Sequence, residues 1–275
     1  MPVISVFIQK GGCGKTTTTI NLAAALQRRD RKILLVDADP QASLTTALDV
    51  NKKSVNLYSE LIKEIKGGES DIGRALVTTR SGLHLIPASA ELSNAEIELA
   101  GAYGREYMFK WMMEKIRADY DFVFIDCPPS IGLLTVNALL ASDYILMPLE
   151  AEFLPLQGIE SFMPHLKFLT RLNKNLEILG FVLTRYDERK IMNRQINQLL
   201  RARFPEKAFQ TRIRNNIRLA KAQESGLDIF NYDCRSHGAE DYFSLANEFL
   251  TRLQFQNEKI EPAGLPSVNE VLISQ

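Results

Sequence analysis

Short apolar segments alternate with longer segments of helical periodicity along most of the chain. The apolar segments cover residues 3–8, 33–37, 83–86, 122–126, 144–149 and 178–184. Between them, segments such as 91–100, 104–118 and 156–172 have the spacing of helices. Runs that are apolar throughout are typical of strands buried on both faces. Their alternation with helices predicts an α/β fold, a doubly wound, mostly parallel sheet with helices on both faces.

The first apolar segment, Val3 to Ile8, leads into a glycine-rich loop. The loop reads Lys10-Gly-Gly-Cys-Gly-Lys-Thr-Thr17, and from Thr16 an amphipathic helix is expected, with arginines at its negative end. Glycines let backbone N–H groups approach phosphates, and a helix N-terminus adds partial positive charge. We therefore expect a nucleotide-binding loop that consists of Gly11, Gly12, Cys13, Gly14, Lys15, Thr16 and Thr17.

This loop differs from the ordinary phosphate-binding pattern. That pattern places a glycine where this chain has Gln9, and Lys10 is a second lysine, five positions before Lys15. Lys15 is expected to bridge the β- and γ-phosphates, and Thr16 to coordinate Mg²⁺. We expect Lys10 and Lys15 to stabilise charge on the transferred phosphoryl group.

Carboxylates follow two of the apolar segments. Residues 33–41 end in Asp37-Ala-Asp39-Pro-Gln, and residues 122–130 end in Asp126-Cys-Pro-Pro-Ser. Ligands of an open parallel sheet bind beyond the C-terminal ends of the strands. We expect Asp126 to orient Mg²⁺ through its water shell and Asp39 to position the attacking water. The alternative for each aspartate is a helix cap or a turn former.

Composition indicates one globular domain followed by a polar tail. A chain of 275 residues with 45% apolar content can bury one large core. From residue 254 onward the sequence becomes polar and contains proline, so we expect a domain over 1–253 and an extension over 254–275. The N-terminus lacks the pattern of a signal peptide and no long apolar window occurs, which predicts a cytoplasmic protein. Three distant cysteines fit reduced thiols.

Charge is distributed unevenly, although its formal sum is zero. Residues 185–221 contain eleven Lys/Arg and three acidic residues, and eleven minus three leaves +8 in this segment. A basic surface on an otherwise acidic protein suits sequence-independent, salt-sensitive binding of DNA phosphates. The alternative is a solvated helix face. The candidate DNA contacts are Arg189, Lys190, Arg214, Arg218 and Lys221.

Taken together, these motifs resemble the ParA partition ATPases, which have a deviant Walker A loop. The resemblance rests on the loop from Lys10 to Thr17, on Asp37-Ala-Asp-Pro-Gln41 and on Asp126-Cys-Pro-Pro-Ser130, and it extends over roughly residues 2 to 250. It implies ATP and Mg²⁺ as cofactors and slow hydrolysis of ATP to ADP and phosphate. It also implies an ATP-sandwiched homodimer in which Lys10 reaches the partner's ATP, Asp39 assists hydrolysis and Asn216 lies near the nucleotide.

The same resemblance implies partners and a cargo. Arg189 and Arg218 match positions at which ParA proteins contact DNA, and a ParB-like or other centromere-binding adaptor stimulates hydrolysis in this family. The predicted function is therefore segregation of a plasmid or chromosome by an ATP-bound dimer that binds non-specific DNA and associates with the nucleoid. Positioning of a protein assembly is the alternative within the family.

The chain departs from the family pattern near Asn216. Many members read Pro-Arg-Asn and then Ser-Glu-Ala-Pro, whereas this chain has Arg214-Asn-Asn and then Ala220-Lys221-Ala-Gln. The changes to Arg214 and Lys221 raise the local positive charge, and the missing proline leaves the contacts to adenine open. Membrane-positioning relatives of the MinD type end in a basic amphipathic helix. Residues 255–275 contain one lysine and three glutamates, so no membrane anchoring is expected.

Other classes of protein use similar scaffolds. A metabolic ATP-dependent enzyme, such as an amide-forming synthetase or a phosphoryl-transfer enzyme, needs a small-molecule pocket rather than a basic surface. A metal-cluster reductase of the nitrogenase iron-protein type needs paired cysteines across its dimer, and Cys127 and Cys234 are poorly placed for that. In residues 105–120, apolar side chains recur at helical spacing around Trp111, which suits either core packing or a partner contact.

Overall fold

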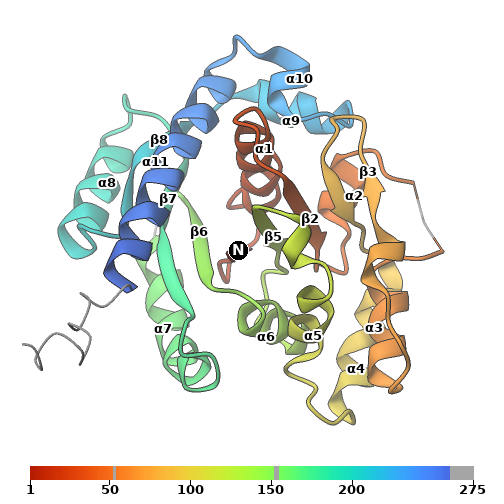
Figure 1. The fold of residues 1–275 in the computed structure, drawn as a ribbon. Helices are drawn as coiled ribbons and strands as arrows, with labels where there is room; N and C mark the ends of the chain where they lie inside the picture. Colours follow the sequence, from red (N-terminus) through yellow and green to blue (C-terminus); the bar gives the residue numbers. More distant parts are fainter. Residues whose placement is uncertain (52–53, 152–154, 261–275) are drawn as a thin grey trace, which may run out of the picture.

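One mixed sheet forms the centre of the molecule (Figure 1). The computed structural model describes residues 1–51, 54–151 and 155–260, with backbone alone at 155, 156 and 255–260. Within these residues the sheet has eight strands in the order β3-β4-β2-β5-β1-β6-β7-β8, and only the β3–β4 pair is antiparallel. The strands are β1 (Val3–Val6), β2 (Ile33–Asp37), β3 (Val77–Thr78), β4 (His84–Ile86), β5 (Phe122–Asp126), β6 (Tyr144–Glu150), β7 (Glu177–Tyr186) and β8 (Ala208–Arg214).

Helices cover both faces of this sheet, and the side chains of β1 and of Phe7 directly after it alternate between the two cores. Ile4 and Val6 share one core with α1 (Lys15–Gln27), α2 (Ser43–Ala47), α9 (Ile217–Glu224), α10 (Ile229–Asp233) and α11 (His237–Ile260). Val3 and Phe7 share the other with α3 (Leu57–Ile65), α4 (Ala95–Ala100), α5 (Met108–Glu114), α6 (Leu133–Leu140), α7 (Pro155–Leu172) and α8 (Ile191–Arg203). Short 3₁₀ helices occupy Ile72–Ala75, Ala90–Asn94 and Arg117–Asp119. The predicted doubly wound architecture is confirmed.

Helix α1 is buried on all sides, so the prediction of an amphipathic helix was wrong. Every residue from Thr18 to Leu26 is buried. The helix packs on the sheet and is also contacted by α10 and by α11, which itself packs on the sheet through Phe249. Alanine and threonine side chains, which predominate in α1, are small enough for close packing against the sheet and these two helices.

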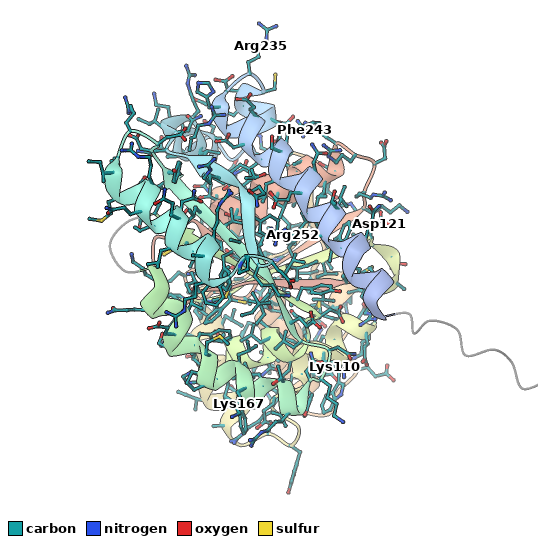
Figure 2. The ribbon with its side chains drawn as sticks, turned by 90° about the vertical axis from the view of Figure 1, so that its left-hand side faces the viewer. Lys110, Asp121, Lys167, Arg235, Phe243 and Arg252 are labelled. Carbon is teal, nitrogen blue, oxygen red and sulfur yellow. The ribbon has the colours of Figure 1, made fainter. Side chains whose placement is uncertain are left out.

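Strand β8, which the apolar pattern did not reveal, lies at the edge of the sheet against α11. Carboxylates of α11 accept hydrogen bonds from its backbone: Glu248 from Gln210 N and Thr211 N, at 2.7 and 2.8 Å, and Asp241 from Arg214 N at 2.8 Å. Figure 2 faces this side of the molecule and shows Arg252 on α11, whose guanidinium lies over the Phe209 ring at 4.0 Å. These contacts cover the open edge of the sheet.

The segment around Trp111 contributes mainly to the core. Met108, Phe109, Met112 and Met113 are buried, whereas Trp111 is 40% exposed and stacks on Tyr107. The core interpretation is therefore confirmed for the methionines, and a partner contact stays a prediction for Trp111.

The C-terminal helix crosses the predicted domain boundary. Helix α11 continues through residue 253 and ends at Ile260, and residues 261–275 of the predicted extension lie outside the described part of the chain. The division into 1–253 and 254–275 therefore stays a prediction. Among the described helices, none is both long and apolar enough to cross a membrane.

Candidate functional site

The glycine-rich loop joins the end of β1 to the start of α1 at the middle of the sheet. From β1 the chain proceeds toward β2 on one side, and from β6 it proceeds toward β7 on the other, which is the arrangement at a ligand-binding crevice. Gly12 and Gly14 have φ angles of 76° and 80°, a left-handed conformation that favours glycine. Gly14 caps α1 without a side-chain hydrogen bond, so the first N–H groups of the helix can bind an anion.

The first turn of α1 brings the predicted metal-binding pair together. Thr16 Oγ1 donates to Asp126 Oδ2 at 2.7 Å, and Thr19 Oγ1 lies 3.3 Å from the other carboxylate oxygen. Lys15 is buried, and its Nζ donates to the backbone oxygen of Lys10 at 3.2 Å. A hydroxyl and a carboxylate are the hard oxygen donors that Mg²⁺ takes when it keeps most of its water shell.

Two buried carboxylates lie next to each other at the ends of β2 and β5, where Asp37 is paired in register with Asp126. Burial raises the pKa of Asp37 to about 6, even though Thr45 donates to it through both its N–H and its hydroxyl. Burial and the neighbouring charge of Asp37 raise the pKa of Asp126 to about 7. A cation bound here would favour the charged form of Asp126, so the site is electrostatically suited to a metal ion.

Asp39, the predicted water-positioning residue, follows β2 and is half-buried. Its backbone N–H donates to Asp37 Oδ1 at 3.2 Å, and its own Oδ1 accepts from Gln41 N at 2.9 Å. The turn that these two bonds hold places Asp39 in the wall of a cavity that Lys15 and Thr16 also line.

This cavity has a volume of about 740 Å³, within the range of small-molecule sites. Cys13 and Asp126 do not line it: Asp126 is buried behind Thr16, and Cys13 is buried with its carbonyl accepting from Thr184 Oγ1 at 3.0 Å. Lys10 is not part of the wall either. The lining residues are Gly11, Gly12, Gly14, Lys15, Thr16, Thr17, Asp39, Ser43, Pro129, Thr184, Arg185, Lys190, Ile213, Arg214, Asn215, Asn216, Ile217, Leu219, Ala220, Gln223 and Tyr242.

The wall opposite the loop comes from the segment after β8. Asn216 caps α9, its side chain accepting from Arg218 N at 2.9 Å. Gln223 Nε2 lies 3.2 Å from Thr17 Oγ1, which ties α9 to the glycine-rich loop. Asn216 was predicted to lie near the nucleotide, whereas Gln223 was missed as a site residue. The Ala220-Lys221-Ala-Gln sequence departs from the family pattern there, and nothing in that local pattern signals a contact with Thr17.

Lys10, the second lysine, contacts a carboxylate that the sequence did not single out. Its Nζ lies 3.6 Å from Glu150 Oε2, and Arg185 Nη1 lies 2.8 Å from Glu150 Oε1. The Glu150 side chain is 9% exposed, against 46% for Lys10. The loop and the ends of β6 and β7 thus meet at one carboxylate between two cations.

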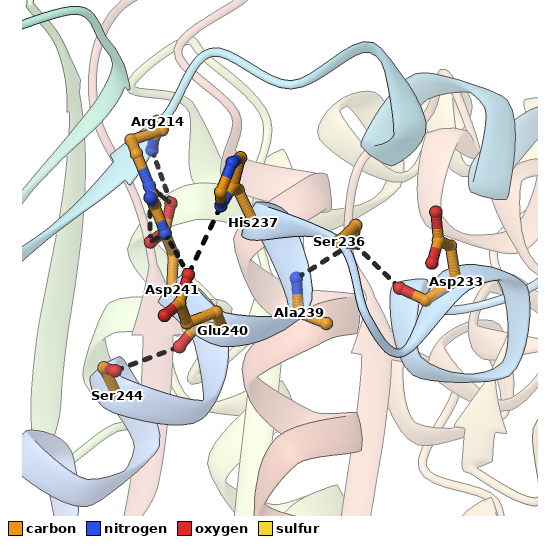
Figure 3. Close-up of polar contacts among 8 residues, drawn as sticks. All are labelled: Arg214, Asp233, Ser236, His237, Ala239, Glu240, Asp241 and Ser244. Atoms are coloured by element: carbon orange, nitrogen blue, oxygen red, sulfur yellow. Dashed lines mark hydrogen bonds and ion pairs between the residues drawn. The ribbon is translucent and has the colours of Figure 1, made fainter.

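The predicted DNA-binding cations fall into two groups. Three of them pair with carboxylates: Arg189 with Asp187, Arg218 with Asp233, and Arg214 with Asp241 and Glu240 at the start of α11 (Figure 3). Lys190 and Lys221 are exposed and form no ion pair with the residues that the structure describes. The partners of Arg214 and Arg218 lie outside residues 185–221, so the sequence excess of +8 overstates the charge that this surface presents.

A second cavity of about 750 Å³ adjoins the first, because Arg214 and Asn215 line both. Its walls carry both signs of charge, from Arg189, Arg212 and Arg214 and from Asp187, Glu188 and Asp241. Arg212 lies over the Tyr186 ring at 4.9 Å. Its cations are thus held mostly by carboxylates and an aromatic ring.

The cysteines have no arrangement suited to a metal cluster. Cys13 and Cys127 are buried, Cys234 is exposed, and all three are free thiols. Burial raises the pKa of Cys127 to about 12, so this thiol is inert near neutral pH. Among the described residues, no three His, Cys, Asp or Glu side chains are grouped to hold a metal.

Known proteins resemble this chain over most of its length. The sequence model of the family described as "AAA domain" matches residues 1–178. The chromosome partitioning protein ParA of Caulobacter vibrioides is 40% identical over 256 residues, which is 91% of this chain and 94% of that protein. The sporulation initiation inhibitor protein Soj of Bacillus subtilis is 39% identical over 248 residues, which is 90% of this chain and 97% of that protein.

Solved structures of similar fold cover the chain equally well. Cobyrinic acid a,c-diamide synthase from Mycobacterium smegmatis, crystallised with ADP and magnesium, gives a TM-score of 0.80 at 32% identity, covering 92% of this chain and 96% of that one. The cell division ATPase MinD from Pyrococcus furiosus gives a TM-score of 0.72 at 25% identity, covering 91% and 98%. Each of these matches spans nine-tenths of this chain.

Proposed function

The chain belongs to the ParA family of partition ATPases, and from that premise we propose that it binds non-specific DNA as an ATP-bound sandwich dimer. Hydrolysis of ATP to ADP and phosphate then releases it from DNA. One observation carries the proposal most directly: the loop with two lysines adjoins a cavity that also holds Thr16 and Asp39. This cavity is continuous with the basic segment through Lys190 and Arg214.

The residues of the cavity fit Mg²⁺ and the phosphates of ATP. Backbone N–H groups of Gly11 to Gly14 and the N-terminus of α1 would hold the phosphates, and Lys15 would turn from the Lys10 carbonyl toward them. Thr16 would coordinate Mg²⁺ directly, with Asp126 orienting it through water. Bound Mg²⁺ would neutralise phosphate charge during phosphoryl transfer.

Asp39 would accept a hydrogen bond from the attacking water. Its carboxylate lies in the cavity wall and has one hydrogen bond from Gln41 N, which leaves acceptor capacity for water. Lys10 of the partner subunit would complete the site by adding positive charge where it develops on the phosphoryl group. Lone chains would therefore hydrolyse ATP slowly.

Exposed cations on and near α9 would contact DNA. Lys190 and Lys221 are candidates for phosphate contacts without loss of an internal ion pair. Arg218 and Arg189 would exchange their partners Asp233 and Asp187 for phosphate. Arg214, held by two carboxylates, would act mainly by fixing the loop between β8 and α9. Such contacts carry no sequence information, which suits non-specific binding.

We also propose a cellular setting for this cycle. The ATP-bound dimer would associate with the nucleoid in the cytoplasm, and a ParB-like or other centromere-binding adaptor would stimulate hydrolysis. Plasmid or chromosome DNA is the proposed cargo, because the similar curated proteins include chromosome partitioning proteins. A protein assembly carried by the same cycle is the alternative cargo.

An amide-forming metabolic enzyme is the second candidate function, favoured by the likeness to the diamide synthase from M. smegmatis. That structure is 32% identical to this chain, below the 40% of the chromosome partitioning protein. The proposed cycle requires ATP-driven dimerisation that depends on Lys10, whereas a synthetase requires a small-molecule amide acceptor.

Sedimentation velocity of the wild type and of Lys10→Ala tests the proposal. With a non-hydrolysable ATP analogue and Mg²⁺, the wild type should sediment as a dimer, and with ADP as a monomer. Lys10→Ala should bind the analogue with the wild-type stoichiometry and remain monomeric. A wild type that stays monomeric with the analogue would contradict the sandwich dimer and favour the synthetase.

A further inference from the structure

We infer that Glu150 is a positioning residue that holds Lys10 on its own chain and thereby sets how readily the ATP-bound dimer forms. This inference rests on the proposed function, in which Lys10 acts on the partner's ATP. A lysine that is to reach another subunit must first leave its contacts within its own. The contact that it must leave is the Glu150 carboxylate, 3.6 Å from Lys10 Nζ.

Glu150 is built into the protein rather than being a mobile surface acid. It is the last residue of β6, a strand that is buried throughout, and its side chain is 9% exposed. A buried carboxylate is costly unless it is paired, so its position beside the loop demands cations there. Lys10 and Arg185 supply them.

The two cations hold Glu150 unequally, which makes the release of Lys10 feasible. Arg185 Nη1 lies 2.8 Å from one carboxylate oxygen, whereas Lys10 Nζ lies 3.6 Å from the other. Arg185 is fixed in a left-handed backbone conformation, with a φ of 50°, directly after Thr184, whose hydroxyl binds the loop. When Lys10 leaves, Arg185 still neutralises Glu150, so no buried charge is left unpaired.

Nucleotide binding can weaken the Lys10–Glu150 contact through Lys15. Lys15 Nζ donates to the backbone oxygen of Lys10 at 3.2 Å. If Lys15 turns to the phosphates, the Lys10 carbonyl loses this donor and the main chain of Lys10 is less restrained. Phosphate binding and the release of Lys10 are then coupled, and the Glu150 contact opposes that release until ATP is bound.

The variant Glu150→Gln removes the charge and keeps the shape of the side chain. In the protein without nucleotide, Lys10 should then react several-fold faster with an amine reagent, as read by peptide mass spectrometry. With a non-hydrolysable ATP analogue, the dimer dissociation constant should fall about 5-fold, since the Lys10–Glu150 contact no longer has to be broken in either chain of the dimer. Glu150→Gln should melt within a few degrees of the wild type.

Glu160→Gln is the matched control. It likewise removes one carboxylate charge from an ion pair, here between Glu160 on α7 and Arg203 on α8. It should change neither the labelling of Lys10 nor dimerisation. If Glu150→Gln leaves labelling or the dimer unchanged, or weakens the dimer, the inference is overturned. If the wild type fails to dimerise at all, the proposed function fails instead, and the labelling result reports separately on the contact.

Discussion

At the scale of single residues, the chemistry of the site depends on where three carboxylates lie. Asp126 and Asp37 are buried behind the cavity wall, whereas Asp39 lies in it. This division separates a carboxylate that can orient a metal ion from one that can orient water. The positions of Asp126 and Asp39 at strand ends were predicted from the two sequence motifs. The difference in burial between these two carboxylates was not predicted.

Asp39→Ala should uncouple binding from hydrolysis. The variant removes a carboxylate that is half-exposed to the cavity and is not bonded to Thr16 or Lys15, so ATP and DNA binding should stay within about 2-fold of the wild type. The ATPase rate should fall by about 10-fold or more, as expected when a residue that positions water is lost. Ser43→Ala, in the same wall, should keep the rate. Loss of ATP affinity in Asp39→Ala would contradict the assigned role.

Asp126 should make the stability of the nucleotide-free protein depend on pH. Its pKa is raised to about 7 in the folded state from an ordinary value of 3.8. The folded state therefore binds more protons than the unfolded state between these values, and the free energy of unfolding falls as pH rises from about 4 to about 7.

Asp126→Asn removes this dependence, so thermal melting should show a gain over the wild type that grows with pH. At pH 8 the gain should be about 4 kcal/mol, roughly 8 °C, and at pH 4 it should be close to zero. Mg²⁺-dependent binding of ATP should weaken in the same variant. A wild type and variant with parallel melting curves at all pH values would refute the raised pKa.

At the scale of elements, the glycine-rich loop needs particular backbone conformations. Gly14 has a φ of 80°, and an added Cβ would lie 3.7 Å from Thr184, so the penalty of a side chain is backbone strain rather than a clash. Gly11 has open space around it and no left-handed φ.

Gly14→Ala should lower the free energy of unfolding by about 1–2 kcal/mol and weaken ATP binding, whereas Gly11→Ala should leave stability unchanged. Urea unfolding and fluorescence titration with an ATP analogue measure both effects. Equal stability of the two variants would mean that the loop tolerates a side chain at Gly14, which would contradict the left-handed backbone conformation of that residue.

The elements that the sequence predicted are those whose pattern is set locally. Fully buried strands such as β1 and β5 are continuous apolar runs, so their existence and approximate bounds were predicted. Strand β8 was missed because, as an edge strand, it mixes Phe209 and Ile213 with Arg212 and Arg214. The burial of α1 on every side was missed because it depends on α11, more than 200 residues later in the chain.

At the scale of the whole molecule, ion pairs between distant segments decide which charges are available to a partner. The sequence count treated residues 185–221 as a basic surface, but Asp233, Glu240 and Asp241 return to pair with Arg214 and Arg218. Glu150 and Lys10, separated by 140 positions, likewise meet only through the fold. Such pairings leave no local pattern in the sequence. The glycine-rich loop and the aspartates of the site were therefore predictable, whereas the carboxylates that pair with Lys10, Arg214 and Arg218 were not.

Exposed cations on α9 and before α8 are then the surface through which the molecule would bind DNA. Because Arg218 is 55% exposed and its contact with Asp233 is 3.5 Å long, exchanging Asp233 for a phosphate costs little. Each such contact releases counterions, which makes DNA affinity fall as salt rises.

Binding of a random-sequence DNA duplex to the wild type and to Arg218→Ala, with ATP, with ADP and without nucleotide, tests the central proposal most directly. At low salt we expect tight binding only with ATP, weaker binding at physiological salt, and a loss of about 5-fold or more in Arg218→Ala. Arg203→Ala is the control, because Arg203 on α8 forms its ion pair with Glu160 on α7. Binding that is equal in all three nucleotide conditions, or absent from all of them, would contradict an ATP-controlled DNA-binding dimer.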